Sequence, residues 1–83
     1  MKLNVRYFAS IRELLGPGES VEVAEGCSVG ALRDALIARG GAHASALARG
    51  RTLRTALNQV LCDEAAPLAE GAELAFFPPV TGG

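Results

Sequence analysis

The last eight residues, 76–83, have residue types that suit the presentation of one reactive group; they read Phe-Phe-Pro-Pro-Val-Thr-Gly-Gly. Pro78 and Pro79 have a fixed φ and no N–H, so they should leave a sheet and run extended. Gly82 and Gly83 lack side chains and can follow a channel too narrow for other residues. The α-carboxylate of Gly83, whose pKa is ordinarily roughly 3.5, is ionised at neutral pH.

A carboxylate is a poor electrophile and a weak nucleophile, so it needs activation before it can react. Adenylation by another protein would give a mixed anhydride with a good leaving group. A sulfur nucleophile could then displace that group and leave a thiocarboxylate, whose sulfur is anionic at pH 7. The two glycines would let this sulfur enter a partner's active site, where positioning supplies much of the catalysis. The chain would then be a carrier of a reactive group and not itself an enzyme.

Other kinds of chemistry find little support in the residue types. With one histidine, His43, and scattered carboxylates, no catalytic triad or acid–base pair is indicated. Residues 16–18, Gly-Pro-Gly, lack the lysine and the spacing of a phosphate-binding loop. Cys27 and Cys62 are far apart and predict buried thiols, so we expect no metal site and no bound cofactor.

The composition is that of one small domain. The chain has 83 residues, of which 49% are hydrophobic and 20% charged, with a net charge of −1. This charge gives no reason to expect nucleic acid or a membrane surface as a partner. Arg49, Arg51 and Arg54 form a basic cluster without aromatic neighbours and predict a solvated face. No membrane-spanning run or signal peptide is visible, so a cytoplasmic location is expected.

The first third of the chain predicts two strands. Residues 3–8 alternate apolar and polar side chains, as a half-buried strand does. Residues 19–24 alternate too and should pair antiparallel with the first strand. Between them, Ser10 and Glu13 have the spacing of a capping box for a short helical turn. The side chains expected in the core are Leu3, Val5, Tyr7, Val21 and Val23.

A main helix should follow Ser28, which can cap it, and should end at Gly40 and Gly41. Arg33 and Asp34 are expected on its solvent side. Its apolar stripe, at helical spacing, consists of Val29, Leu32, Ala35 and Leu36.

The pattern after the main helix is weaker. Residues 43–48 are rich in alanine and predict a short helix. Residues 53–61 predict a third strand that is interrupted near residues 58–59, with residues 60–62 as a short return strand.

The final strand, residues 72–77, places Leu74 and Phe76 in the core by its period of two. Two strands, a crossing helix and further strands predict an α+β domain, with a mixed sheet and one main helix packed on one face. With the first and last strands as parallel central neighbours, the domain comprises residues 1–77. Residues 78–83 are then an extended tail that can reach about 20 Å beyond it.

The same alternation predicts a partner-binding patch at the base of the tail. Because Tyr7 and Phe76 face the core, their neighbours Phe8 and Phe77 must point to the other face of the sheet. Leu61 on the return strand is a plausible neighbour. Large apolar side chains exposed together usually mark a partner site. The alternative is that a loop from residues 42–52 covers them.

The sequence resembles the small, sulfur-carrier subunit of molybdopterin synthase, a ubiquitin-like family with a β-grasp fold. The matching segments are Tyr-Phe-Ala at 7–9, Arg-Glu-Leu at 12–14, Leu-Asn-Gln at 57–59, Pro67-Leu68 with Gly71 and Glu73, and the whole of 76–83.

The resemblance implies a role for each part of the tail. An activating enzyme would use ATP to adenylate Gly83, and a sulfur donor enzyme would complete the thiocarboxylate. Two sulfur transfers to a cyclic pyranopterin precursor would follow inside a large catalytic subunit, in a heterotetramer. Gly82 would pass the channel with Gly83, and the partner-binding residues of the tail would be Pro78, Pro79, Val80 and Thr81.

Two other functions share these features. One is a sulfur carrier for another pathway, such as thiamine thiazole synthesis. The other is a ubiquitin-like protein modifier or interaction module. A modifier would join Gly83 to a lysine of its target, and for chains of itself only Lys2 is available.

Overall fold

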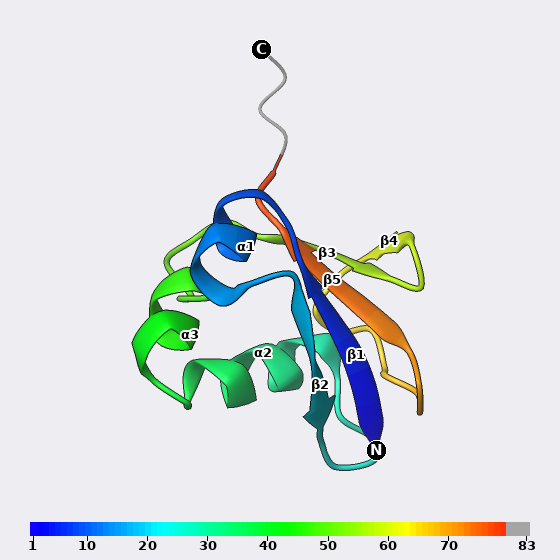
Figure 1. The fold of residues 1–83 in the computed structure, drawn as a ribbon. Helices are drawn as coiled ribbons and strands as arrows, with labels where there is room; N and C mark the ends of the chain where they lie inside the picture. The colour runs from blue at the N-terminus through cyan, green and yellow to red at the C-terminus, as the bar shows by residue number, and fades with distance from the viewer. Residues whose placement is uncertain (80–83) are drawn as a thin grey trace.

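The computed structural model describes residues 1–79, and residues 80–83 lie outside this description. Five strands and three helices make an α+β domain, as the sequence predicts (Figure 1). In chain order they are β1 (Lys2–Tyr7), α1 (Ala9–Leu15), β2 (Gly18–Glu22), α2 (Val29–Ile37), α3 (Gly41–Ala46), β3 (Arg54–Leu57), β4 (Val60–Cys62) and β5 (Glu73–Phe77).

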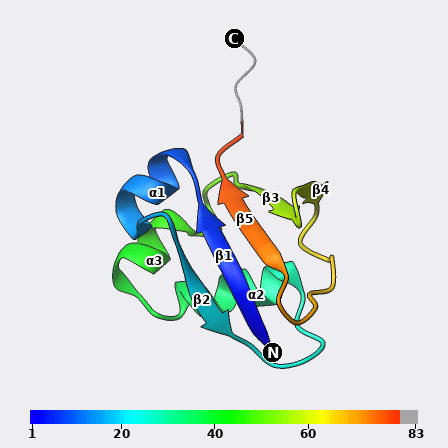
Figure 2. The ribbon, with the colours of Figure 1, turned by 45° about the vertical axis from the view of Figure 1, so that its right-hand side comes forward.

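The five strands form one mixed sheet in the order β2-β1-β5-β3-β4. The first and last strands, β1 and β5, are parallel neighbours at its centre, and the other pairs are antiparallel. α2 crosses behind the sheet, and α1 and α3 pack on the same side (Figure 2). Within residues 1–79, no helix lies over the opposite face of the sheet.

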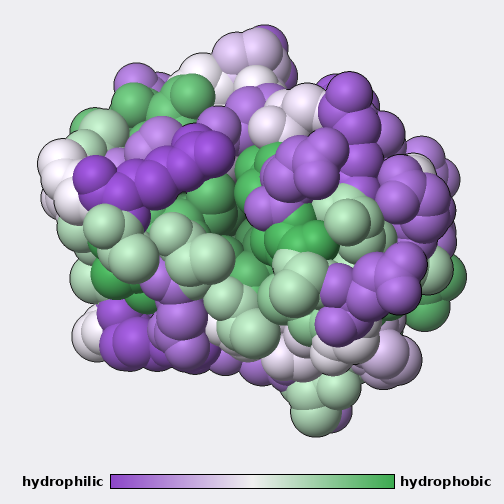
Figure 3. Space-filling view, turned by 90° about the horizontal axis from the view of Figure 1, so that it is seen from below, coloured by the Kyte–Doolittle hydropathy of each residue, from purple (hydrophilic) through white to green (hydrophobic). Residues whose placement is uncertain are grey.

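The core lies between the sheet and α2, because each central strand alternates between the two faces. β1 buries every second side chain, and Leu74 and Phe76 of β5 are fully buried, as the alternation predicts. The packed residues are Leu3, Val5, Tyr7, Ile11, Val21, Val29, Leu32, Leu36, Ala46, Leu47, Leu68, Ala72, Leu74 and Phe76. At the end of the molecule opposite the tail, hydrophobic residues are exposed near the middle of the surface, with hydrophilic residues around them (Figure 3).

The main helix begins as predicted, but two of its side chains point the other way. Ser28 caps α2, its Oγ accepting a hydrogen bond from the backbone N–H of Ala31 at 3.2 Å. Ala35 is exposed, so it is not part of the apolar stripe. Arg33, expected in solvent, is only 4% exposed. The segment after α3 covers this flank of α2, and its carbonyl groups accept the guanidinium hydrogen bonds.

Arg33 replaces the expected solvent contacts with a set of internal ones. Its Nε donates to the carbonyl of Leu47 at 2.8 Å, and its Nη2 donates to the carbonyls of Ala48 and Arg51. Its Nη1 forms a 2.7 Å ion pair with Glu64. A buried guanidinium is tolerated only when its donors are matched in this way.

The predicted capping box at Ser10 is wrong. With Ser10 as the N-cap the helix would begin at Ile11, but α1 begins two residues earlier, at Ala9, and Phe8 occupies its N-cap position without any side-chain cap. The reason is the central strand pairing: the Phe8 N–H still donates to the carbonyl of Phe76 at 3.2 Å, so strand geometry continues directly into the helix.

Boundaries in the second half shift by only a few residues. α3 starts at Gly41 instead of residue 43, and β3 starts at Arg54 instead of residue 53. Asn58 and Gln59, with φ of 50° and 69°, make the two-residue turn between β3 and β4. The predicted interruption near residues 58–59 is therefore a tight hairpin.

The burial of Phe76 sets an expectation for stability. Replacing Phe76 by Ala removes a ring that is fully buried against Tyr7 and should lower the free energy of unfolding by about 3–5 kcal/mol. Urea unfolding measures this loss. Phe77→Ala is the matched control, since Phe77 is half-buried on the other face and should cost much less; equal losses would contradict the assignment of Phe76 alone to the core.

Candidate functional site: the base of the tail and the outer sheet face

The tail begins where the central strand of the sheet ends. β5 stops at Phe77, whose register partner is Arg54 of β3, and Pro78 follows. Proline has no N–H, so the ladder cannot continue past this pair. Pro78 and Pro79 are half-buried at the edge of the domain. The remaining predicted tail residues lie outside the described residues, and their roles stay predictions: Val80, Thr81, Gly82 and Gly83.

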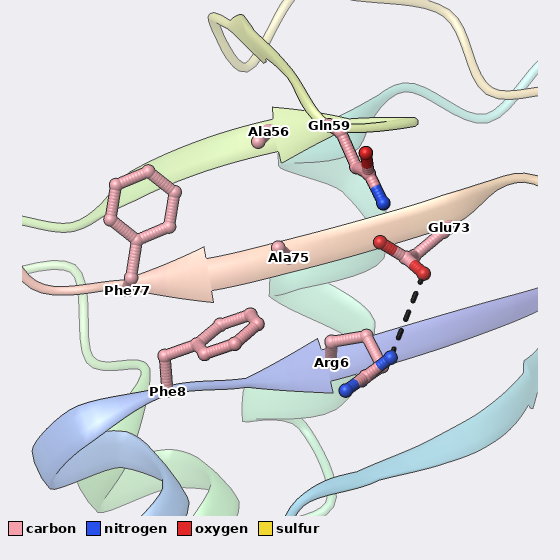
Figure 4. A pocket seen from close by; sticks show the side chains of 7 residues that line it. All are labelled: Arg6, Phe8, Ala56, Gln59, Glu73, Ala75 and Phe77. Atoms are coloured by element: carbon pink, nitrogen blue, oxygen red, sulfur yellow. Dashed lines mark ion pairs between the residues drawn. The ribbon is translucent and has the colours of Figure 1, made fainter.

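The uncovered face of the sheet carries the predicted apolar patch. Phe8 is 39% exposed, Leu61 is 67% exposed, and Phe77 is half-buried between them and the tail. Phe8 and Phe77 line one groove, as the alternation of β1 and β5 predicts (Figure 4). α3 and the segment after it pack against α1 and α2 instead, so the alternative of a covering loop from residues 42–52 is wrong.

Strand register places Leu61 on the same face. Ala75 of β5 pairs with Arg6 on one side and with Ala56 on the other, and Ala56 pairs with Leu61. Directly paired residues on neighbouring strands share a face of the sheet. We call Phe8, Leu61, Phe77, Ala56 and Ala75 the outer-face patch.

The groove in this patch has a volume of about 500 Å³. Two small side chains, Ala56 and Ala75, form its floor and leave open the space that longer ones would fill (Figure 4). An ion pair between Arg6 and Glu73, with N and O atoms 3.7 Å apart, closes one end. The full lining is Arg6, Phe8, Ala56, Gln59, Glu73, Ala75 and Phe77 (Figure 4).

Sequence reasoning missed the polar and small members of this groove. Arg6 and Phe8 are two positions apart, as are Ala75 and Phe77, so the same alternation could have placed each pair on one face. The Arg6 guanidinium also lies 5.9 Å from the centre of the Phe8 ring, within cation–π range.

A hydrogen-bonded cluster on the helix side holds the strand ends that present the patch. The Tyr7 ring stacks on Phe76 with centroids 6.3 Å apart, directly behind Phe8 and Phe77. The Tyr7 hydroxyl donates to Oε2 of Glu19 at 2.7 Å. Burial raises the pKa of Tyr7, and the bond to Glu19 raises it further. This tyrosine therefore remains a hydrogen-bond donor at neutral pH.

Glu19 is the centre of that cluster. Arg39 donates to its Oε1 at 2.7 Å, and Nε2 of His43 lies 2.7 Å from its Oε2. Burial by itself raises the pKa of Glu19, but hydrogen bonds from His43, Tyr7 and Arg39 outweigh it and lower the pKa to about 2. Because an ionised carboxylate only accepts, Nε2 of His43 must carry a hydrogen. His43 thus has a structural role in this cluster.

The described residues offer no second kind of site. Among residues 1–79, no three His, Cys, Asp or Glu side chains gather as a metal site would require. Cys27 and Cys62 are free and half-buried. None of the helices in this part of the chain has the length and apolarity that a bilayer crossing demands.

Fold and site together define a ubiquitin-like β-grasp domain with an apolar face at the base of its C-terminal segment. The profile of the ThiS family matches residues 5–83, and the chain belongs to this family. The molybdopterin synthase sulfur carrier subunit of Escherichia coli is 43% identical over 81 residues, which cover 98% of this chain and 99% of that protein. Two further relatives, 41% and 35% identical, have the same name.

Solved structures confirm the β-grasp fold. SAMP1 of Haloferax volcanii superimposes with a TM-score of 0.81 at 28% identity, over the whole of both chains. A chain from the complex of subunits 1 and 2 of molybdopterin-converting factor from Helicobacter pylori matches with a TM-score of 0.70 at 27% identity. The match covers the whole of this chain and the whole of that one.

The depressed pKa of Glu19 makes stability depend on pH in a defined direction. The ordinary value is 4.5 and the folded value about 2. The contribution of ionised Glu19 to the free energy of unfolding is therefore complete above pH 4.5. It declines as pH falls from there through 2, because the unfolded chain takes up the proton first. Glu19→Gln should cost about 2 kcal/mol at pH 7 and flatten this acid limb.

Urea unfolding at a series of pH values measures both effects. Glu25→Gln is the control, because Glu25 is exposed and forms no ion pair among residues 1–79. An acid limb that is equally steep in the Glu19→Gln variant would show that the cluster does not stabilise the fold.

Proposed function

We propose that this protein is the sulfur carrier of a molybdopterin synthase and that the α-carboxylate of Gly83 carries the sulfur. The observation that supports this most strongly is the full-length similarity to sulfur carrier subunits, up to 43% identity. The tail sequence adds a chemical reason, because Gly82 and Gly83 form a thin end that suits a narrow channel.

The proposed chemistry has two stages. A carboxylate oxygen of Gly83 attacks the α-phosphorus of ATP in an activating enzyme, pyrophosphate leaves, and an acyl-adenylate forms. A hydrosulfide equivalent from a sulfur donor enzyme then displaces AMP and leaves the thiocarboxylate. In the synthase its sulfur forms a bond to a carbon of a cyclic pyranopterin precursor and displaces an oxygen substituent of that carbon. Water then cleaves the resulting thioester, which returns the Gly83 carboxylate and leaves the sulfur on the pterin, and two such transfers supply the dithiolene. ATP is a substrate of the activating enzyme, and the carrier itself holds no cofactor.

The protein contributes position and not catalysis in this scheme. β5 lies at the centre of the sheet and is paired on both sides, so the point where Pro78 leaves is rigid. A partner that binds the outer-face patch would hold that point next to its own pocket. Residues 78–83 would then deliver Gly83 over a distance of up to about 20 Å.

The large catalytic subunit is the proposed partner at the patch, within a heterotetramer of two small and two large subunits. A relative of this chain has been solved as a complex of subunits 1 and 2, which supports such a pairing. The activating enzyme and the sulfur donor are further proposed partners. The proposed location is the cytoplasm, where reducing conditions keep thiols such as Cys27 and Cys62 unpaired.

A protein modifier is the second candidate, favoured by one observation. SAMP1, a small archaeal modifier protein, shares the fold at 28% identity. Both functions begin with an activated carboxyl group and differ only in the nucleophile, sulfur or a lysine amine. The higher identity of the sulfur carrier subunits makes the carrier the better-supported function.

The first test concerns the chain end. Adding one alanine after Gly83 should abolish thiocarboxylate formation, because the carboxyl group is displaced and a side chain enters the channel. Intact mass spectrometry after incubation with the activating enzyme, ATP and a sulfur donor detects the exchange of oxygen for sulfur. An extended protein that still gains sulfur, with its extra residue intact, would contradict the proposal. Unchanged thermal melting controls for folding.

The second test concerns docking. Phe77→Ala removes an aromatic side chain from the patch, and truncating an aromatic anchor of an interface costs about 2–4 kcal/mol of binding. Association with the large subunit should weaken roughly thirty-fold or more in titration calorimetry. Val60→Ala is the control, because Val60 is 67% exposed but pairs with Leu57, on the side of the core. Equal affinities of the two variants would show that the patch does not dock the partner.

A further inference from the structure

Two arginines stand at opposite corners of the outer-face patch. Arg6 lies on β1 beside Ala75, and Arg54 lies on β3 directly opposite Phe77. Both are exposed, and both alternate with buried neighbours, so both point to the outer face. From the strand geometry they are about 12 Å apart, two strand spacings across the sheet and two residues along it, with the groove residues Ala75 and Phe77 between them.

Three other arginines are neutralised within the domain, whereas Arg12 and Arg51, like Arg54, form no ion pair among residues 1–79. Arg33, Arg39 and Arg49 form ion pairs with Glu64, Glu19 and Asp34 at 2.7, 2.7 and 2.9 Å. All three lie on the helix side of the sheet. The expected basic cluster of residues 49, 51 and 54 is thus divided, because Arg49 turns back to α2.

The outer-face arginines lack this neutralisation. Arg6 has only the 3.7 Å contact to Glu73, with the two side chains 50% and 34% exposed. Such an exposed pair is worth little and can exchange partners. Within residues 1–79, Arg54 forms no ion pair at all. Positive charge is therefore available on the face of the sheet that no helix of the described residues covers.

We propose that Arg6 and Arg54 select the partner of the outer-face patch, by requiring carboxylates at the matching rim positions of an otherwise apolar protein surface. This inference rests on the proposed function, since the partner meant is the large synthase subunit. Charges at the rim of an interface steer association and exclude wrong partners, while the apolar centre supplies the affinity. The two arginines would also fix the orientation in which the tail enters the partner.

Other occupants fit the face less well. A nucleic acid would meet Glu73 in the groove and a chain with net charge −1, and two arginines make too few phosphate contacts. A second copy of this chain would bring its own arginines to the same face, with Glu73 as the sole carboxylate among the groove residues.

The experiment measures binding of the large subunit encoded by the same genome, by stopped-flow and calorimetry, at salt from about 50 to about 500 mM. Arg54→Glu should weaken binding about ten-fold at low salt, mainly through slower association, and should lose most of the salt dependence. Arg6→Gln should act in the same direction and more weakly. Lys2→Glu is the control: it makes the same charge change on the same face, about 13 Å along β1 from Arg6.

The outcomes separate this inference from the proposed function. The inference is overturned, and the proposed function stands, if the unaltered chain binds the large subunit and Arg54→Glu binds it with the same affinity. The same holds if Arg54→Glu and Lys2→Glu weaken binding equally. If the unaltered chain does not bind at all, both are overturned. If sedimentation shows that the free chain dimerises and that Arg54→Glu abolishes the dimer, the face belongs to a second copy and the inference fails.

A crosslink can show the carboxylate directly. Lys2 is the chain's one lysine, so Arg54→Lys adds an amine at a single new place. A carbodiimide should then join position 54 to an Asp or Glu of the large subunit, identified by peptide mass spectrometry. If Lys2 forms a crosslink to the large subunit and position 54 forms none, the proposed rim contact is contradicted.

Discussion

The parallel pairing of β1 with β5 is the constraint on which the rest of the structure depends. It places the first and last strands at the centre of the sheet and stacks Tyr7 on Phe76 in the core. Because side chains alternate along a strand, the next residues, Phe8 and Phe77, then have to lie together on the other face. The same pairing decides where the tail leaves. The packing of the core, the position of the patch and the exit point of the tail all follow from the register of β1 with β5.

Local alternation explains why so much of this arrangement could be predicted. The faces of β1 and β5, the cap at Ser28 and the break at Pro78 each depend on a few adjacent residues and on general backbone preferences. The parallel order of the central strands is non-local, and it was expected partly because the chain resembles a known family. The reactive role proposed for Gly83 likewise rests on residue types and resemblance.

The features that could not be predicted involve side chains meeting across distant segments. Arg33 has the spacing of a solvent-facing residue, and it is buried because the segment after α3 brings carbonyl groups to it. Arg54 joined a predicted basic cluster by sequence proximity, but strand register moves it to the outer face and away from Arg49. Helical spacing and sequence proximity carry no information about which segment will pack on a given flank.

The central position of β5 also has a mechanical meaning. The N-terminus and the tail leave the sheet at opposite ends of two parallel strands (Figure 1). If the domain is docked and the tail is pulled, the force acts along β5, parallel to β1. The hydrogen bonds between the two strands then bear the load together, in shear, and do not break one after another. This geometry would suit the proposed carrier, whose last residues would enter one partner, be withdrawn, and enter another.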